Sequence, residues 1–383
     1  MENLNQSLAT LTLLRQELHK YPEVSGKEIN TAKKIVSFLE SYSPDELINN
    51  IGSTGVLAIY HGKKAGKTIL FRAELDALPI DEINTFDHRS VNKSVSHKCG
   101  HDGHMAILCG LAMELHTNRP ETGTVILLFQ PAEEDGTGAE KVLNDAKFIY
   151  KPQFVFALHN IPGYTKNQVV VKVNTFSCAV NSIIIKLKGV TSHAAEPQMG
   201  INPALALSKI TERFNQLIQT NLHKEKYCLI TPIYSKMGKK AYGVSAGAAE
   251  IHFTIRSNSN EQMHEIEKKL EKEALLIAKQ FNLKCIVSWT QKFYANENNP
   301  TAVEHITAAT KHLNLNILEK EIPFTWGEDF GIFTHQFSGA MFGLGSGMTS
   351  PALHNPDYDF PDDIIPTGIN LFHQISKQIL NAH

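Results

Sequence analysis

Short runs of consecutive apolar residues, separated by stretches with helical periodicity, constrain the fold of this chain most strongly. Four such runs precede residue 160, and they read GVLAIY, TILFRAEL, TVILLFQ and FVFALH. A strand that is apolar on both sides must be covered on both faces, as in a parallel or mixed sheet between helices. The pattern therefore predicts an α/β fold, with helices over residues 8–18, 32–39 and 104–115.

The pattern changes near residue 180 and returns near residue 294. Between these points the sequence predicts a strand, a helix, two strands, a helix and a strand, the order of a split β-α-β domain. A chain of 383 residues is long enough for two domains. We therefore expect residues 1–179 and 294–383 to form a mixed-sheet α/β domain, and residues 180–293 to form an inserted α+β, ferredoxin-like domain.

Charge and composition argue against several classes of protein. The 37 basic and 39 acidic side chains leave a formal net charge of -2, so we expect no nucleic acid partner. The sequence lacks a run of about 18 apolar residues and lacks the pattern of a signal peptide, so we expect no membrane association. Five cysteines, an odd number without regular spacing, fit a reducing compartment, and we expect a cytoplasmic protein.

The segment HKCGHDGH is the first of four segments that offer metal ligands. Cys99 and His101 place a thiolate and an imidazole two residues apart on a glycine-interrupted turn, which can direct both side chains inward. The alternative is a turn whose polar residues only cap the following helix, with Asp102 as the cap. The high count of 18 histidines also points to metal.

The segment FQPAEEDGTGAE presents Glu133 and Glu134 side by side, directly after an apolar run that ends at Pro131. Adjacent carboxylates at the end of one strand cannot easily share one environment. One of them can therefore bind metal while its neighbour takes a proton from water. A solvated acidic loop is the alternative for this pair.

Two further histidines complete the set of donors. His159 follows the apolar run FVFAL, and His354 lies in the loop SPALHNPDYDFPDD before the last predicted helix. Either histidine alone would more often be structural, but ligands at several strand ends converge in an open α/β sheet. Five donors are too many for one open tetrahedral site, and they suit two cations that share a ligand. These donors are Cys99, His101, Glu134, His159 and His354.

Taken together, these motifs resemble those of the di-metal aminoacylase and carboxypeptidase group of hydrolases, and within it the branch of hippurate hydrolases and indole-acetyl-amino-acid hydrolases. The resemblance covers nearly the whole chain, and it rests on RAELDALPI, HKCGHDGH, FQPAEEDGTGA, LHNIPG, SHAAEPQMGINP, GEDF and LHNPDYDF. It implies that the five donors hold two cations bridged by Cys99, and that Glu133 is the general base. It also implies a lid domain that dimerises, with His193 reaching the substrate oxyanion, often in the neighbouring subunit.

Further roles concern the surroundings of the site. We expect Asp76, in RAELDALPI, to support the metal ligands from outside the coordination sphere, and we expect Asn202 and Arg256 to contact the substrate. An arginine that closes a strand suits a substrate carboxylate, although a structural role is the equal alternative. Members of the branch often have Asn-Val-Ile-Pro where this chain reads GVSA at residues 243–246, so the asparagine amide that contributes to their substrate binding is missing here.

The sequence thus predicts a metal-dependent amidohydrolase that cleaves small N-acylated amino acids into a carboxylic acid and a free amino acid. We expect Zn²⁺ or Mn²⁺ at the mixed sulfur, nitrogen and oxygen donors, with which Co²⁺ and Ni²⁺ are also compatible. The first alternative is a dipeptidase or carboxypeptidase on the same site, and the second is a protein that binds metal only for stability. We expect a homodimer formed through the lid domain.

Overall fold

The computed structural model describes residues 2–223 and 226–381, with side chains from residue 7 onward. It divides into two compact units. The large unit comprises Met1–Phe176, Asn296–Glu321 and Asp329–His383, and the small unit comprises Ser177–Ala295 and Ile322–Glu328. The predicted fold class, a mixed-sheet α/β domain with an inserted α+β domain, is confirmed. The range predicted for the inserted domain, residues 180–293, lies within the small unit.

An eight-stranded mixed sheet forms the centre of the large unit, in the order β1-β2-β4-β3-β5-β16-β6-β15. The four central strands β4, β3, β5 and β16 are parallel to one another, whereas β2 and β6 run antiparallel to their inner neighbours. Parallel strands direct their carboxyl ends to the same edge of a sheet, which is where sites of open α/β sheets lie. The strands are β1 (Glu46–Ile51), β2 (Gly55–His61), β3 (Lys64–Glu74), β4 (Thr122–Gln130), β5 (Phe154–Pro162), β6 (Val169–Val171), β15 (Ile317–Glu319) and β16 (Gly339–Gly347).

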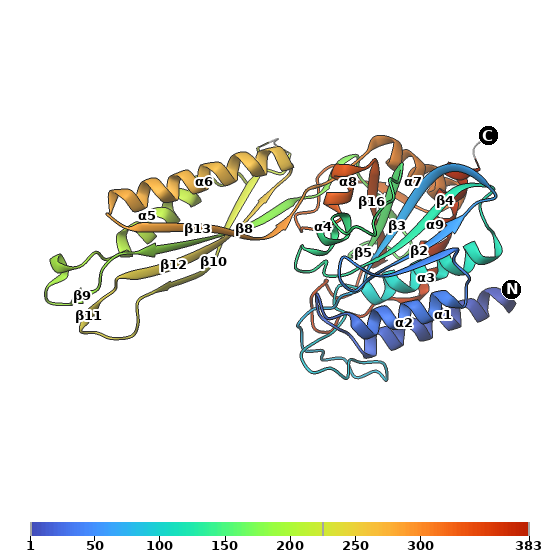
Figure 1. Ribbon diagram of the computed structural model, residues 1–383, viewed down its shortest axis with the longest axis horizontal. Helices are drawn as coiled ribbons and strands as arrows, with labels where there is room; N and C mark the ends of the chain where they lie inside the picture. The colour runs from blue at the N-terminus through green and yellow to red at the C-terminus, as the bar shows by residue number, and fades with distance from the viewer. Residues whose placement is uncertain (1, 224–225, 382–383) are drawn as a thin grey trace. The chain divides into compact units, whose positions relative to one another are not determined.

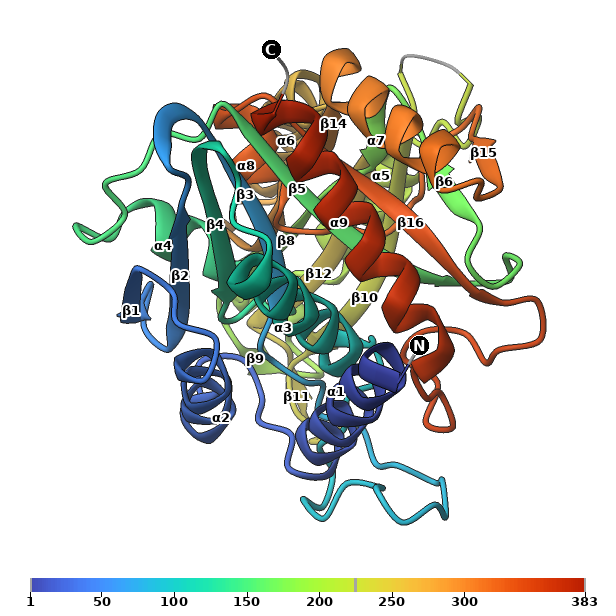
Figure 2. The same ribbon diagram turned by 90° about the vertical axis from the view of Figure 1, so that its right-hand side faces the viewer.

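Helices cover this sheet, and α3 and α9 cross one of its faces with α1 beside α3 (Figure 2). Most of the 17 residues of α3 are buried, because this helix lies between the sheet and other helices. Close packing depends on its glycines, since a Cβ at Gly103 would lie 2.3 Å from the Phe360 ring. The helices of the large unit are α1 (Glu2–Lys20), α2 (Ile29–Glu40), α3 (His101–Thr117), α4 (Gly138–Leu143), α7 (Pro300–His312), α8 (Gly331–Gln336) and α9 (Ile365–Leu380).

The small unit contains a four-stranded antiparallel sheet in the order β10-β12-β8-β13, with α5 and α6 along one face (Figure 1). Along β12 buried residues alternate with partly exposed ones, so one face of this sheet packs on the helices. This order of strands and helices is the ferredoxin-like arrangement that the sequence predicts. The elements are β8 (Ala179–Lys188), α5 (Ala204–Asn215), β10 (Cys228–Met237), β12 (Ala248–Ser257), α6 (Asn260–Gln280) and β13 (Lys284–Phe293).

Short elements complete both units. In the small unit β9 (Ser192–His193) pairs with β11 (Val244–Ser245), and η1 (Pro197–Met199) follows β9. The chain also forms β7 (Asn174–Ser177), β14 (Asn296–Asn298) and η2 (Asp362–Ile364). Within residues 2–223 and 226–381, every helix is too short or too polar to span a lipid bilayer.

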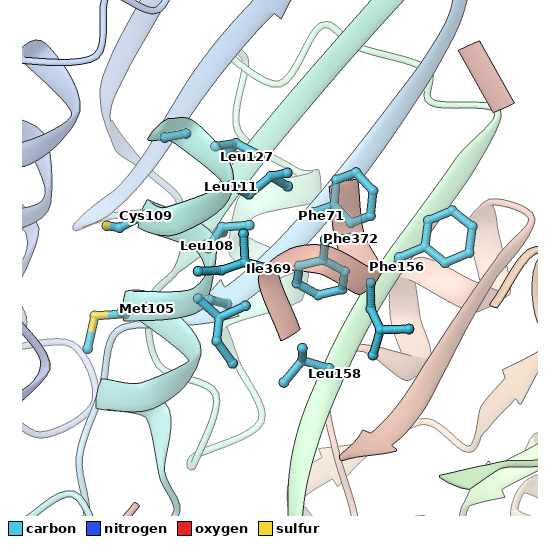
Figure 3. Close-up of a cluster of buried hydrophobic side chains, with 14 of the residues drawn as sticks. Phe71, Met105, Leu108, Cys109, Leu111, Leu127, Phe156, Leu158, Ile369 and Phe372 are labelled. Atoms are coloured by element: carbon cyan, nitrogen blue, oxygen red, sulfur yellow. The ribbon is translucent and has the colours of Figure 1, made fainter. Parts of the chain in front are cut away.

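The core of the large unit lies between the sheet and the helices α3 and α9 (Figure 3). Phe71 of β3 is fully buried there, with its ring centroid 5.7 Å from that of Phe156 and 4.7 Å from that of Phe372. These rings join two neighbouring strands to α9, so Phe71 fixes the helix layer on the sheet.

We expect Phe71→Ala to lower the free energy of unfolding by about 3–5 kcal/mol, because it leaves a cavity among fully buried rings. Urea unfolding of the two proteins measures the difference. Leu13→Ala on α1 is the control, since Leu13 is 67% exposed and its loss should change stability by about 0.5 kcal/mol or less. Equal effects of the two substitutions would contradict this account of the core.

Candidate metal centre

Ligand atoms of the five predicted donors lie close together in the large unit, with Glu134 just after β4 and His159 in the last part of β5. One ligand atom each of Cys99, His101 and His159 lie within 4.8 Å of one another, and so do those of Cys99, Glu134 and His354. Cys99 belongs to both groups. Its sulfur is therefore a possible ligand common to these two groups.

The distances between donor atoms suit metal coordination. Cys99 Sγ lies 3.5 Å from His159 Nε2, and Glu134 Oε1 lies 3.8 Å from the Nε2 atoms of both His101 and His354. A tetrahedral zinc ion with ligands about 2.0–2.3 Å away brings two of its ligand atoms to about 3.3–3.8 Å from each other. The side chains therefore need little movement to share a cation.

The two buried imidazoles present the nitrogen that a metal uses. Nδ1 of His101 donates to the Asp76 carbonyl oxygen at 2.8 Å, and Nδ1 of His159 donates to the Asn160 carbonyl oxygen at 2.9 Å. These bonds place the proton on Nδ1 and leave a lone pair on Nε2. Nε2 of His101 is buried and lacks a hydrogen-bond partner among the described residues, as expected of an atom reserved for a cation.

The charge of the cluster also suits cations. Burial raises the pKa of the Cys99 thiol well above its usual range, and the Glu134 and Glu133 carboxylates add to this effect. A positive ion at this place reverses the balance and stabilises the thiolate. The residues present therefore fit a pair of divalent cations.

His354 reaches the cluster from the loop between β16 and η2. Its backbone N–H donates to the Lys98 carbonyl oxygen at 2.8 Å, which ties this loop to the turn that carries Cys99. Its φ of 68° is in the left-handed region, where residues other than glycine are uncommon and gather at functional sites. The side chain is 52% exposed, so this edge of the cluster faces solvent.

Residues 131–139, here called the glutamate turn, carry Glu133 and Glu134 from β4 into α4. Three buried carboxylates each accept one backbone N–H of this turn. Glu28 accepts from Ala132 at 2.9 Å, Asp76 accepts from Glu134 at 3.0 Å, and Asp329 accepts from Ala139 at 2.9 Å. The direction of the two glutamates is therefore set by the backbone as well as by their own contacts.

Asp76 lies where a supporting residue is expected. Its carbonyl oxygen holds His101, while its carboxylate accepts both the Ser25 hydroxyl at 2.7 Å and the Glu134 N–H. Burial by itself would raise the pKa of Asp76, but these bonds together with His101 lower it. The backbone and the side chain of one residue thus support ligands from two segments.

Several buried residues beneath the donors are absent from the sequence prediction. Arg72 is fully buried, pairs with Glu74, donates to Asp329 at 2.7 Å and donates to Gln130 at 2.9 Å. Burial would raise the pKa of Glu74, but Arg72 and His104 hold it well below its usual range. The signal for this pair is RAE inside an apolar strand, because a buried charge is tolerated only with a partner.

The role of Asp102 as a helix cap, which was the alternative interpretation of HKCGHDGH, is wrong. Gly100 is the N-cap residue of α3, with φ of 92°, and Asp102 lies inside the helix. The Asp102 carboxylate accepts a hydrogen bond from His19 Nδ1 at 2.8 Å, and Arg15 lies 3.5 Å away. Asp102 therefore joins α3 to α1.

Three of the predicted site residues lie in the small unit. His193 is an exposed residue of β9, and its Nδ1 accepts the Ala195 N–H at 3.0 Å. Asn202 donates to Ser245 Oγ at 2.9 Å, and Arg256 donates to the Thr325 carbonyl oxygen at 2.6 Å. The five donors and Glu133 all lie in the large unit.

Comparisons with known proteins show what this chain is similar to. The model of peptidase family M20/M25/M40 matches residues 70–378. N-acetyldiaminopimelate deacetylase of Exiguobacterium sibiricum is 29% identical over 370 residues, which cover 95% of this chain and 98% of that protein. N-acetylcysteine deacetylase of Bacillus subtilis is 28% identical over 370 residues, which cover 96% of each chain.

A solved structure shares the whole fold. The Bacillus subtilis YxeP protein, described as a dinuclear metal binding peptidase from the M20 family, aligns over 99% of both chains with a TM-score of 0.85 and 26% identity.

We expect Cys99→Ala to lower metal content at both positions, from about two ions per chain to less than one, because its sulfur would be a ligand of both ions. Elemental analysis after dialysis against buffer measures the content. Cys109→Ala is the control, since Cys109 is a buried cysteine of α3 in the hydrophobic core and its loss should leave the metal content unchanged. Full metal content in Cys99→Ala would show that the sulfur is not the shared ligand.

Proposed function

This chain belongs to peptidase family M20/M25/M40, and we propose that it is a metal-dependent amidohydrolase that cleaves N-acylated amino acids. The observation that carries this proposal is the position of Glu133. Its carboxylate lies beside the donors but belongs to neither of the two groups that contain Cys99. Glu133 Oε2 lies 3.8 Å from His101 Nε2, next to Glu134 in the chain. The two deacetylase relatives support an N-acyl amino acid as the substrate class.

Cys99, His101, Glu134, His159 and His354 would hold two divalent cations, and Cys99 would be the shared ligand. We propose Zn²⁺ or Mn²⁺, with Co²⁺ and Ni²⁺ also compatible with these donors. When bound, such cations polarise a carbonyl oxygen and lower the pKa of water.

Glu133 is the general base in this proposal. Glu133 as a whole residue is 5% exposed, and its Oε1 accepts the Asp329 N–H at 3.4 Å, so one oxygen is directed toward the protein. The other oxygen, Oε2, lies 3.8 Å from His101 Nε2, on the side of the metal donors, where it would accept a proton from the attacking water. Glu133 then returns this proton to the departing amine nitrogen, and the products are a carboxylic acid and a free amino acid.

His193 would stabilise the oxyanion. Because Nδ1 of His193 accepts the Ala195 N–H, a neutral imidazole carries its proton on Nε2, where it can be donated to a negatively charged oxygen. In a dimer, the position of the small unit would decide whether this histidine acts in its own subunit or in the neighbouring one. We propose a homodimer formed through the small unit, where large apolar side chains such as Ile233, Tyr242 and Val244 are exposed.

Arg256 and Asn202 would bind the substrate. A guanidinium carries five N–H donors, and the bond to Thr325 uses one of them, so Arg256 retains donors for a carboxylate. Both ends of the Asn202 amide already take part in local bonds, with Ser245 Oγ and with the Ala204 N–H. Its contribution is therefore to shape the loop between β9 and α5 as well as to offer a polar surface.

We expect the protein, reconstituted separately with Zn²⁺, Mn²⁺, Co²⁺ and Ni²⁺, to hydrolyse N-acetyl or N-benzoyl amino acids faster than dipeptides. Release of the free amino acid measures both activities. A preference for dipeptides would replace the proposal with the peptidase alternative. Metal binding without hydrolysis of any member of the panel would point to a protein that uses the ions for stability alone.

We expect Glu133→Gln to retain its fold and both ions and to lose about 10²–10⁴-fold in kcat, because an amide cannot accept the proton. Turnover is measured beside metal content and urea unfolding. The control is Glu140→Gln, a neighbouring glutamate whose side chain is exposed in α4 and which should turn over at the wild-type rate. A rate near that of the wild type in Glu133→Gln would remove Glu133 from this role.

A further inference from the structure

Glu28 is a fully buried glutamate whose side chain serves a distant part of the chain. It lies at the start of α2 and outside residues 70–378, the range matched by the family model. Oε1 accepts the backbone N–H groups of Gly26 at 2.7 Å and Ala132 at 2.9 Å, and Oε2 accepts the Thr54 hydroxyl at 2.7 Å. Three donors directed at two oxygens describe a carboxylate used as an acceptor.

The bond to Ala132 acts on the residue directly before Glu133. Ala132 has a φ of 52°, a left-handed conformation that is unfavourable for a residue with a Cβ atom. This conformation persists only where the surrounding structure enforces it. The Glu28 carboxylate, by accepting the Ala132 N–H, is one of the groups that enforce it.

The segment that carries Glu28 reaches the glutamate turn at a second point. Ser25 Oγ donates to Asp76 Oδ2 at 2.7 Å, and the same oxygen accepts the Glu134 N–H at 3.0 Å. Val24 pairs with Ala77 as an isolated bridge next to Asp76. Residues 23–28, here called the N-terminal strap, thus contact the supports of both glutamates.

The contacts of Glu28 do not serve its own helix. The side chain of Glu28 makes no cap hydrogen bond to α2. That task falls to Glu23, which accepts the backbone N–H groups of Asn30 and Thr31, both at 2.8 Å. Two glutamates of one strap therefore have different tasks, since Glu23 closes the helix and Glu28 holds the glutamate turn.

We propose that Glu28 is a positioning residue for the hydrolytic reaction, which fixes Ala132 so that the Glu133 carboxylate is aimed at the substrate. This inference rests on the proposed function. A displacement of about 1 Å of a reacting group can cost about 10²-fold in rate. Loss of Glu28 therefore lowers kcat through Glu133, while substrate binding and metal binding remain.

The test compares Glu28→Gln and Glu28→Ala with Glu23→Gln, on the N-acyl amino acid that the wild type hydrolyses fastest. We expect kcat to fall about 10-fold in Glu28→Gln, which keeps one acceptor oxygen, and about 10²-fold in Glu28→Ala. The KM and the metal content should change less than about 3-fold. Glu23→Gln is the matched control, because it loses hydrogen bonds of the same strap and should keep its kcat within about 2-fold.

A second measurement, which does not depend on activity, reports on the order of the glutamate turn directly. Amide hydrogen exchange of a peptide covering residues 131–139 should become faster in both Glu28 variants and stay unchanged in Glu23→Gln. If the Glu28 variants do not fold, Thr54→Val removes only one bond to the carboxylate and should show the same two effects at smaller size. Unchanged exchange and unchanged kcat in Thr54→Val would then overturn the inference.

The combination with Glu133→Gln decides whether Glu28 acts through Glu133. We expect Glu28→Gln to have almost no effect on the residual rate of a Glu133→Gln protein, since the positioned group is already lost. An equal fold-loss in both backgrounds, or equal losses of kcat in the Glu28 variants and in Glu23→Gln, would overturn the inference. A wild type that hydrolyses no member of the panel is a different result, because it refutes the proposed function.

Discussion

The burial of carboxylates around the predicted donors is the constraint on which the site depends. Glu28, Glu74, Asp76, Glu133 and Asp329 are each at most 5% exposed, and a buried charge without a partner costs several kcal/mol. Arg72 balances Glu74 and Asp329, whereas hydrogen bonds from backbone N–H groups stabilise the others. The hydrogen bonds that stabilise the buried carboxylates also hold the backbone of the glutamate turn in place.

Besides the carboxylates that Arg72 balances, a second group of acidic side chains has a charge to be balanced. Arg72 and His104 lie beside Glu74, whereas Glu133, Glu134 and Cys99 face one another at the open end of the sheet. His101 Nε2, which is buried without a hydrogen-bond partner among the described residues, and the raised pKa of the Cys99 thiol both suit a positive ion at this place. Because such ions bind the folded chain, their binding and the order of the surrounding loops are linked.

The sequence predicts those parts of the structure that leave a local signal. Apolar runs predict buried strands, and each predicted donor stands just after such a run or in a turn rich in glycine or proline, so the convergence of the five donors could be predicted. Arg72 and Glu74 also leave a signal in the sequence. Because they lie inside an apolar run, their charges suggest the end of a strand and not a buried ion pair. Glu28 leaves none, because its partner Ala132 is 104 residues away and the contact joins a side chain to the backbone.

Glu133 and Glu134 show why such backbone contacts matter for chemistry. Two identical side chains on adjacent residues can take different roles when the backbone that carries them turns and then stays in place. The left-handed Ala132 provides the turn, and Glu28, Asp76 and Asp329 hold it from three separate segments. Glu134 is thereby directed at His101 and His354, while one oxygen of Glu133 faces the Asp329 N–H and the other is left toward the cluster. In the proposed reaction, the difference between a ligand and a base would thus come from the surroundings of the turn, since the side chains themselves are the same.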